Sequence, residues 1–223
     1  MLKSLRRPTS QDMQRLFEEG GFYHVYNRGV DKREVFDSVY DLQRFLQSMV
    51  EFNTREPIGS LHLNSFDAVK RGCRSEPLVD IISYCLNSNH YHFILKQCVE
   101  NGISEFMKRL GGGYTKYFNH RNRRSGVLFQ GKYKSIHIVT NEYLLYLSAY
   151  VNLNDCVHQL RRPTSQSSWG EYINKDKKGI CHKEIILDQF KNSEDYKQFA
   201  EEALVNILER KNLAKELEDM LFD

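Results

Sequence analysis

Hydrophobic and polar positions repeat with two different periods along the first two thirds of the chain, and these periods predict its strands and helices. Runs rich in aromatic and β-branched residues predict four strands, at residues 22–27, 78–86, 90–95 and 133–139. Apolar residues spaced three and four positions apart predict a helix after the first, the third and the fourth strand. The predicted order is therefore strand, helix, two strands, helix, strand and helix.

Polar residues mark the N-termini of two of these helices. The helix after the first strand begins after Asp37 or Ser38, because side chains of these types cap helix N-termini. For the same reason the helix after the fourth strand begins at Thr140 or Asn141, and its apolar pattern continues to about Leu153.

The middle helix, predicted at 103–118, contains three consecutive glycines, from Gly111 to Gly113. Each glycine inside a helix costs roughly 1 kcal/mol relative to alanine. We therefore expect this helix to kink or to divide into two short helices. The turn-rich stretch 53–77 and the basic stretch 119–131 are predicted to be loops.

This order of elements predicts an α+β fold, a ferredoxin-like or RRM-like plait built on one antiparallel sheet. We assign residues 21–157 to this domain, residues 1–20 to an N-terminal tail, and residues 158–223 to a mostly helical C-terminal extension. The heptapeptide at 5–11 recurs at 160–166, and no physical role follows from this repeat.

The composition is typical of soluble globular proteins, since 40% of the 223 residues are hydrophobic and 27% are charged. The apolar runs are too short to span a bilayer, so we expect no membrane partner. The basic start lacks the apolar stretch of a secretory signal, which favours a cytoplasmic location. Five widely spaced cysteines fit neither a disulfide framework nor a structural zinc site.

The net charge of +3 indicates little about partners, but the charge is unevenly distributed. Residues 106–140 contain eight lysines and arginines and no acidic residue, whereas residues 182–223 contain eleven acidic and six basic residues. This asymmetry predicts a polyanion-binding surface in the first region and a separate accessory element in the second.

Two histidines in the third predicted strand are the first candidates for chemistry. Side chains alternate between the two faces of a strand, so His90 and His92 share one face. Two imidazoles side by side on a rigid strand suit a divalent metal ion, although two ligands do not complete a site. The alternative is a surface or hydrogen-bonded histidine pair with no metal.

The helix after the fourth strand offers a phenol and an amide on one face. Tyr150 and Asn154 are four residues apart, which places their side chains next to each other on a helix. A phenol is a nucleophile when a metal polarises the phosphate that it attacks. The alternative is that Tyr143, Tyr146 and Tyr150 form an aromatic stripe in the core.

Four segments of the sequence occur together, and in this order, in a known enzyme family. They are Phe22-Tyr-His-Val-Tyr-Asn-Arg-Gly29, Tyr84-Cys-Leu-Asn-Ser-Asn-His-Tyr-His-Phe93, Gly126-Val-Leu-Phe-Gln-Gly-Lys-Tyr-Lys-Ser135 and Tyr150-Val-Asn-Leu-Asn154. With them the chain resembles the single-tyrosine HUH transposases, an IS200-like family, and within it the REP-associated tyrosine transposases. The resemblance covers roughly residues 22–156 and, more weakly, 167–173 and the tail.

The resemblance implies a metal-dependent endonuclease and strand transferase that acts on single-stranded DNA, with hairpin-bearing DNA as the expected partner. His90 and His92 correspond to the family's metal-binding histidines, Tyr150 to its nucleophile and Asn154 to its third metal ligand. The cofactor is then Mg²⁺ or Mn²⁺, and cleavage leaves a 5′-phosphotyrosine intermediate. Residues 21–157 are the catalytic domain in this interpretation.

The chain departs from the family at two places beside these residues. Asn87-Ser88 stands where the family commonly has Met-Pro, and Asn154-Asp155 stands where it commonly has Asn-Pro. We expect both replacements to loosen the local turn, because they remove proline.

A basic surface with interleaved aromatic residues is predicted to bind the DNA, by phosphate contacts and by stacking on unpaired bases. The predicted DNA-binding residues are Arg28, Lys108, Lys116, Arg121, Arg123, Arg124, Gln130, Lys132 and Lys134. The predicted stacking residues are Tyr114, Tyr117, Phe118, Phe129 and Tyr133. The alternative is a solvated basic face without a DNA-binding role.

Two other functions remain open at this stage. The plait with surface aromatics is also the architecture of RNA-recognition domains, which bind nucleic acid without cleaving it. The second alternative function is that of a metal-dependent phosphodiesterase, which uses water instead of tyrosine. The sequence specifies neither the DNA element nor whether the chain acts as a monomer or a homodimer.

Overall fold

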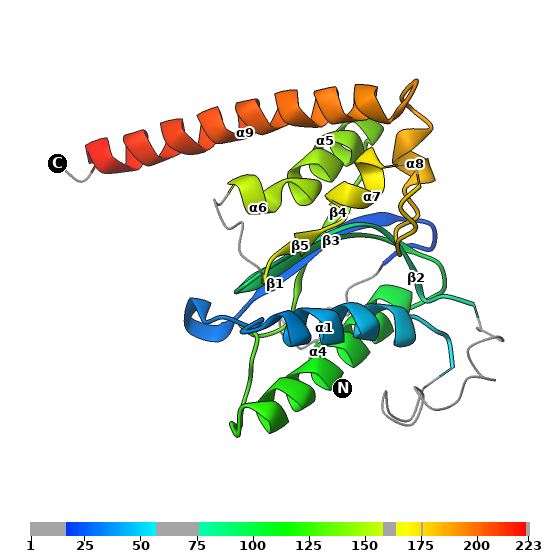
Figure 1. Ribbon diagram of the computed structural model, residues 1–223, viewed down its shortest axis with the longest axis vertical. Coiled ribbons are helices and arrows are strands. Elements are labelled where there is room, and N and C mark those ends of the chain that lie inside the picture. The colour runs from blue at the N-terminus through cyan, green and yellow to red at the C-terminus, as the bar shows by residue number, and fades with distance from the viewer. Residues whose placement is uncertain (1–16, 57–75, 158–163, 175, 222–223) are drawn as a thin grey trace, which may run out of the picture.

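The computed structural model describes residues 17–56, 76–157, 164–174 and 176–221, with side chains described as far as residue 209. Most of the predicted N-terminal tail, most of the predicted loop at 53–77, the first heptapeptide copy and part of the second lie outside these residues. Figure 1 shows three layers, in which one sheet lies between two groups of helices.

The sheet has five strands in the order β4-β1-β3-β2-β5, and neighbouring strands are antiparallel. The strands are β1 (Phe22–Arg28), β2 (Val79–Asn87), β3 (His90–Gln97), β4 (Lys134–Ile138) and β5 (Gln166–Ser167). The order of β1 to β4, with one helix after β1 and another after β3, is that of the ferredoxin-like plait. The predicted fold class is therefore confirmed.

Two helices cover one face of the sheet, below it in Figure 1. They are α1 (Val39–Glu51), which follows the 3₁₀ turn η1 (Val30–Lys32), and α4 (Gly102–Arg121). Ser38 caps α1, because its hydroxyl accepts a hydrogen bond from the Asp41 amide at 3.3 Å. Buried aromatic rings, such as Phe45 of α1 and Phe93 of β3, fill the space between these helices and the sheet.

The other face carries the remaining helices. They are α5 (Asn141–Asn152), α6 (Asn154–Val157), α7 (Trp169–Ile173), α8 (Glu184–Leu187) and α9 (Ser193–Leu221). The long helix α9 lies across α5 (Figure 1). The buried Tyr196 hydroxyl of α9 bonds to Ser148 Oγ at 3.1 Å and accepts from Asn152 Nδ2 at 2.9 Å, so α9 is tied to α5 by hydrogen bonds. No described helix is long and apolar enough to cross a membrane.

The pairing register decides which side chains face α5. Tyr26 of β1 lies opposite His92 of β3, and Arg28 lies opposite His90. Because side chains alternate along each strand, His24, Tyr26, His90 and His92 all point to the α5 face. The predicted shared face of the two HUH histidines is thus the face covered by α5.

The triple glycine does not interrupt α4, which is one continuous helix from Gly102 to Arg121. The expectation of a kink or of two helices is wrong, because helix packing outweighs the unfavourable glycine propensity. Gly113 has a packing role: a Cβ atom there would approach Phe52 Cε2, at the end of α1, to 2.7 Å. Gly111 and Gly112 face open space at the Cβ position.

These surroundings predict opposite outcomes for two alanine substitutions in α4. Gly112→Ala should raise the free energy of unfolding by about 0.5–1 kcal/mol, because alanine is the better helix former and meets nothing. Gly113→Ala should gain less or lose stability, because the new methyl group must displace the Phe52 ring. Urea unfolding followed by circular dichroism measures both, and equal gains would contradict the packing role of Gly113.

Candidate active site

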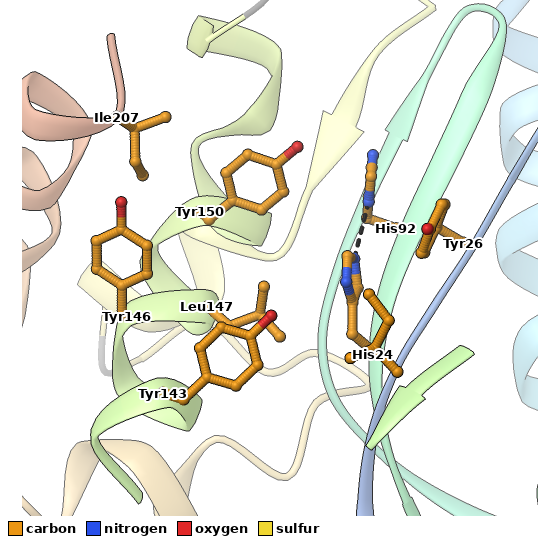
Figure 2. A pocket seen from close by; sticks show the side chains of 9 residues that line it. His24, Tyr26, His92, Tyr143, Tyr146, Leu147, Tyr150 and Ile207 are labelled. Atoms are coloured by element: carbon orange, nitrogen blue, oxygen red, sulfur yellow. Dashed lines mark hydrogen bonds between the residues drawn. The ribbon is translucent and has the colours of Figure 1, made fainter. Parts of the chain in front are cut away.

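The two HUH histidines meet the candidate nucleophile across the interface between the sheet and α5. The ring centroids of His90 and His92 are 5.2 Å apart, with the ring planes at 90°. The Tyr150 ring of α5 lies 5.7 Å from the His92 ring, edge to face. Figure 2 shows Tyr150 on α5 facing His92, His24 and Tyr26 on the sheet. Tertiary packing therefore brings together three of the residues singled out in the sequence.

Asn154 joins this group from the start of α6. The predicted helix 141–153 ends at Asn152, and Leu153, in a non-helical conformation, separates α5 from α6. Asn154 is fully buried, and its Oδ1 lies 3.2 Å from His90 Nε2. The Asn154 side chain still acts on Tyr150, because it lowers the pKa of the Tyr150 phenol against the larger, opposite effect of burial.

Asn87, at the end of β2, connects the histidine to the buried amide. Its Nδ2 donates to Asn154 Oδ1 at 2.8 Å and lies 2.9 Å from His90 Nε2. The backbone anchors this turn, because the Ser88 carbonyl accepts hydrogen bonds from the backbone amides of Val35 and Phe36 at 2.7 and 3.0 Å. The expectation that Asn87-Ser88 loosens the turn relative to Met-Pro stays a prediction.

The expected loosening after Asn154 also stays a prediction. Asp155 Oδ1 accepts a hydrogen bond from the backbone amide of Cys156 at 2.9 Å. The side chain of Asp155 thus supplies a local restraint where a proline is absent.

The hydrogen bonds of His90 specify the state of its ring. Nδ1 lies 2.6 Å from Asn89 Oδ1, an oxygen that only accepts, so Nδ1 carries the proton. Burial lowers the pKa of His90, which favours the neutral ring. The lone pair of Nε2 then lies on the side of Asn154 Oδ1, which is also an electron-pair donor. Asn87 Nδ2 donates a hydrogen bond to each of these two atoms.

This donor set fits a divalent cation. Imidazole nitrogen from His90 and His92 together with the amide oxygen of Asn154 gives mixed nitrogen and oxygen ligation. Within the described part of the chain, no group of three or more His, Cys, Asp and Glu side chains is arranged to hold a metal, so the candidate donor set here includes an amide oxygen. The Asn154 Nδ2 atom is buried without a hydrogen-bond partner, so this amide is oriented through its oxygen alone.

A pocket of about 450 Å³ opens between α5, the sheet and α9 beside these residues. Its lining residues are His24, Tyr26, His92, Ile136, Tyr143, Tyr146, Leu147, Tyr150 and Ile207 (Figure 2). The tyrosine stripe of α5 therefore lines a cavity and is only partly buried, with Tyr143 39% exposed. Burial raises the pKa of the Tyr150 phenol, and the nearby Asn154 side chain partly opposes this shift.

Three of the predicted DNA-binding residues lie beside the histidines. Arg28 is the cross-strand neighbour of His90, and its Nε donates to Gln130 Oε1 at 2.5 Å. Lys134 Nζ lies 6.0 Å from the centre of the Tyr26 ring, which stacks in turn on His92. This places a basic edge next to the candidate site.

The other six predicted DNA-binding residues lie on α4 or in the loop after it. Lys108, Lys116 and Arg121 belong to α4, on the opposite face of the sheet from Tyr150, and Arg123, Arg124 and Lys132 follow in the loop. Arg121 forms an ion pair with the buried Asp41. Arg124 donates to Asn119 Oδ1 at 2.6 Å and to the Val127 carbonyl at 3.0 Å. Both arginines therefore have structural partners.

The aromatic residues of this region are not positioned to stack on DNA bases. Tyr114, Phe118 and Phe129 are buried in the core between α4 and the sheet, and the Tyr114 hydroxyl donates to the Val35 carbonyl at 2.6 Å. Tyr117 and Tyr133 are partly buried and pack on the same core. The predicted stacking role is wrong for these three buried rings. Helical spacing turns Tyr114 and Phe118 toward the sheet, and Phe129 is held by an antiparallel bridge to Gly29.

Sequence reasoning missed three residues that contact the site. His24 bonds to His92, Asn89 bonds to His90, and Asn87 links His90 to Asn154. The sequence contained only weak signals for these three residues. His24 is two positions from Tyr26 in the first strand and so shares its face, and Asn87 stands where the family has another residue. Only the strand pairing shows that these side chains meet.

Comparisons with known proteins show the family of this chain. Residues 23–154, more than half of the chain, match the model of the IS200-like transposases. A solved structure of a REP-associated tyrosine transposase bound to a REP hairpin aligns with 76% of this chain and 88% of its own, at 14% identity and a TM-score of 0.47. No curated protein matches the chain significantly. From the extent of the family match we conclude that the chain belongs to the IS200-like transposase family.

Proposed function

We propose that this transposase cleaves and rejoins single-stranded DNA through Tyr150, with Mg²⁺ or Mn²⁺ held by His90, His92 and Asn154. The observation that carries the proposal is the convergence of these four side chains. Tyr150 lies edge to face with His92, and Asn154 Oδ1 lies 3.2 Å from His90 Nε2. Three separate elements, β3, α5 and α6, thus contribute the side chains on which the proposal depends.

In the proposed reaction, the Tyr150 oxygen attacks the scissile phosphorus and the bond to the 3′-oxygen breaks. The products are a 5′-phosphotyrosine and a free 3′-hydroxyl, so the phosphodiester energy is kept in the covalent link. A 3′-hydroxyl reverses the step by attacking the phosphotyrosine, which needs no nucleotide cofactor. When bound, the cation polarises the scissile phosphate and stabilises the charge that develops on it.

The surrounding residues have separate roles in this proposal. The bond from Asn87 Nδ2 holds the Asn154 oxygen toward His90. Burial keeps the Tyr150 phenol protonated at neutral pH, so its proton must leave as the oxygen attacks. Because α9 is bonded to α5 through Tyr196, the extension 158–223 supports the nucleophile of the catalytic domain 21–157.

Single-stranded or hairpin DNA is the proposed partner, with phosphates contacting the basic edge of Arg28, Gln130 and Lys134 beside the histidines. Lys132 in the adjoining loop extends this edge. We propose that the basic residues on and after α4 (Lys108, Lys116, Arg121, Arg123, Arg124) contact the flanking DNA and not the scissile strand.

Removing the Tyr150 hydroxyl tests the nucleophile. Tyr150→Phe should abolish the covalent protein–DNA adduct while the fold survives, since the ring stays and one hydrogen bond is worth about 1 kcal/mol. The measurement is a boiling-resistant, DNA-linked band on a denaturing gel, mapped by mass spectrometry. Tyr143→Phe and Tyr146→Phe, on the same helix, are the matched controls. Adduct formation at the wild-type level in Tyr150→Phe would refute the assignment, and cleavage without any adduct would indicate a water-using phosphodiesterase.

Removing either histidine tests the metal site. His90→Ala or His92→Ala should abolish Mn²⁺-dependent cleavage and leave hairpin binding within several-fold, because basic side chains supply most of the DNA affinity. Cleavage is followed with end-labelled hairpin DNA, and binding by fluorescence anisotropy. Retained Mn²⁺-dependent cleavage in either variant would contradict the ligand assignment.

Salt dependence tests where the scissile strand lies. Removing Arg28 and Lys134 together by glutamine substitution should weaken binding of a short unstructured oligonucleotide and reduce the log–log salt slope by about 1.4, at about 0.7 per lost phosphate contact. The matched control is the Lys108→Gln, Lys116→Gln pair, which removes the same charge on the opposite face of the sheet. If the control changes the slope and the first pair does not, the scissile strand lies along α4.

A further inference from the structure

We propose that His24 is a positioning residue: its Nε2 accepts a hydrogen bond from Nδ1–H of His92 and so holds His92 with its Nε2 lone pair available to a metal ion. The inference rests on the proposed function, because it takes His92 as a metal ligand. It adds a residue from a different strand that contacts neither the DNA phosphate nor the cation.

The contact between the two rings is short, buried and built by the sheet. His24 Nε2 and His92 Nδ1 are 2.9 Å apart, drawn as the dashed line in Figure 2, and both side chains are less than a tenth exposed. The residues lie on adjacent strands, where His24 is diagonal to His92 on the same face. Their rings are nearly parallel, at 17°. Tyr26 packs nearly parallel to both rings, at 28° to His24 and 18° to His92, which restricts their rotation.

One proton occupies this nitrogen–nitrogen contact, and its position has a chemical consequence. If His24 donates, the neutral His92 ring must carry its proton on Nε2 and has no lone pair there. If His92 donates through Nδ1, its Nε2 is a ligand atom. A metal ligand needs the second arrangement, because a histidine bound through one nitrogen donates its other N–H to an acceptor. The His24 ring is buried beside His92, and a neutral imidazole has one acceptor nitrogen that can receive this bond.

His90 shows the same arrangement independently. Its Nδ1 donates to Asn89 Oδ1 at 2.6 Å, which leaves Nε2 directed at Asn154 Oδ1. Both histidines of the motif are thus bonded at Nδ1, one by an asparagine in the turn and one by His24 from β1. An amide oxygen can only accept, which fixes the direction of the bond at His90, and the matching geometry supports the same direction at His92.

The tautomer can be measured directly in the wild-type protein. Two-dimensional ¹H–¹⁵N NMR of the ¹⁵N-histidine-labelled, metal-free chain distinguishes a ring protonated at Nδ1 from one protonated at Nε2. His92→Gln identifies its signals by their loss. We expect His92 to carry its proton on Nδ1. Protonation on Nε2 in the folded wild type would overturn the proposal.

Substitution at His24 tests the consequence for metal binding, without DNA or turnover. The probe is Mn²⁺ alone, followed by the electron paramagnetic resonance signal of the free ion. His24→Phe keeps a ring and removes the acceptor, so Mn²⁺ affinity should fall about 10–100-fold. His24→Gln restores an acceptor oxygen and should lose less. The control is His137→Gln, which removes an exposed imidazole from β4 and should leave the affinity unchanged.

The outcomes separate this inference from the proposed function. Wild-type Mn²⁺ affinity in folded His24→Phe would overturn the role of His24, while the Tyr150 adduct would be unaffected by that result. Unchanged Mn²⁺ affinity in His92→Gln would instead contradict the proposed metal site itself. If His24→Phe fails to fold, the Mn²⁺ affinity of His24→Gln and the tautomer of His92 in the wild type test the role of His24. Equal losses in the phenylalanine and glutamine variants, with unchanged His92 signals, would overturn the hydrogen-bond role and leave only packing.

Discussion

The antiparallel register between β1 and β3 is the constraint on which the rest of the site depends. It sets Tyr26 opposite His92 and Arg28 opposite His90, so that the alternating side chains of both strands turn the same way. A slip of one residue would move this whole set to the opposite face, where the rings of α1 and α4 pack. The buried residues on both faces oppose such a slip, because each strand would expose apolar side chains and bury polar ones.

Covering the second face of the sheet determines where the candidate nucleophile, Tyr150, lies. A plait with helices on one side only leaves the other side open, and here α5 and the C-terminal helices occupy it. Tyr196 is fully buried and bonds to two residues of α5, so α5 is held from the sheet side and from the α9 side. Ile207 of α9 also lines the pocket beside Tyr150. The extension is therefore part of the surroundings of the site, although its acidic charge opposes direct DNA contact.

Polar groups at the end of the β2–β3 hairpin can be buried at little energetic cost because they form hydrogen bonds with one another. Asn87 donates to Asn154, and Asn89 accepts from His90, in a region where an unpaired polar group costs roughly 1–3 kcal/mol. The Asn154 Nδ2 atom is the exception among the described residues of this network.

The sequence by itself determined the first four strands, the order of the elements of the plait, the shared face of His90 and His92 and the family, because these follow from local periodicity and from residues close together in the chain. It also indicated Tyr150 and Asn154 through their spacing. It did not indicate β5, which forms only by pairing with β2. It gave the wrong result for the glycines of α4 and for rings such as Tyr114, since packing against distant elements decides both. Only the tertiary structure decided that His24 meets His92 across 68 positions, and that α5 lies over them. Such contacts depend on strand register and layer packing, which no local pattern encodes.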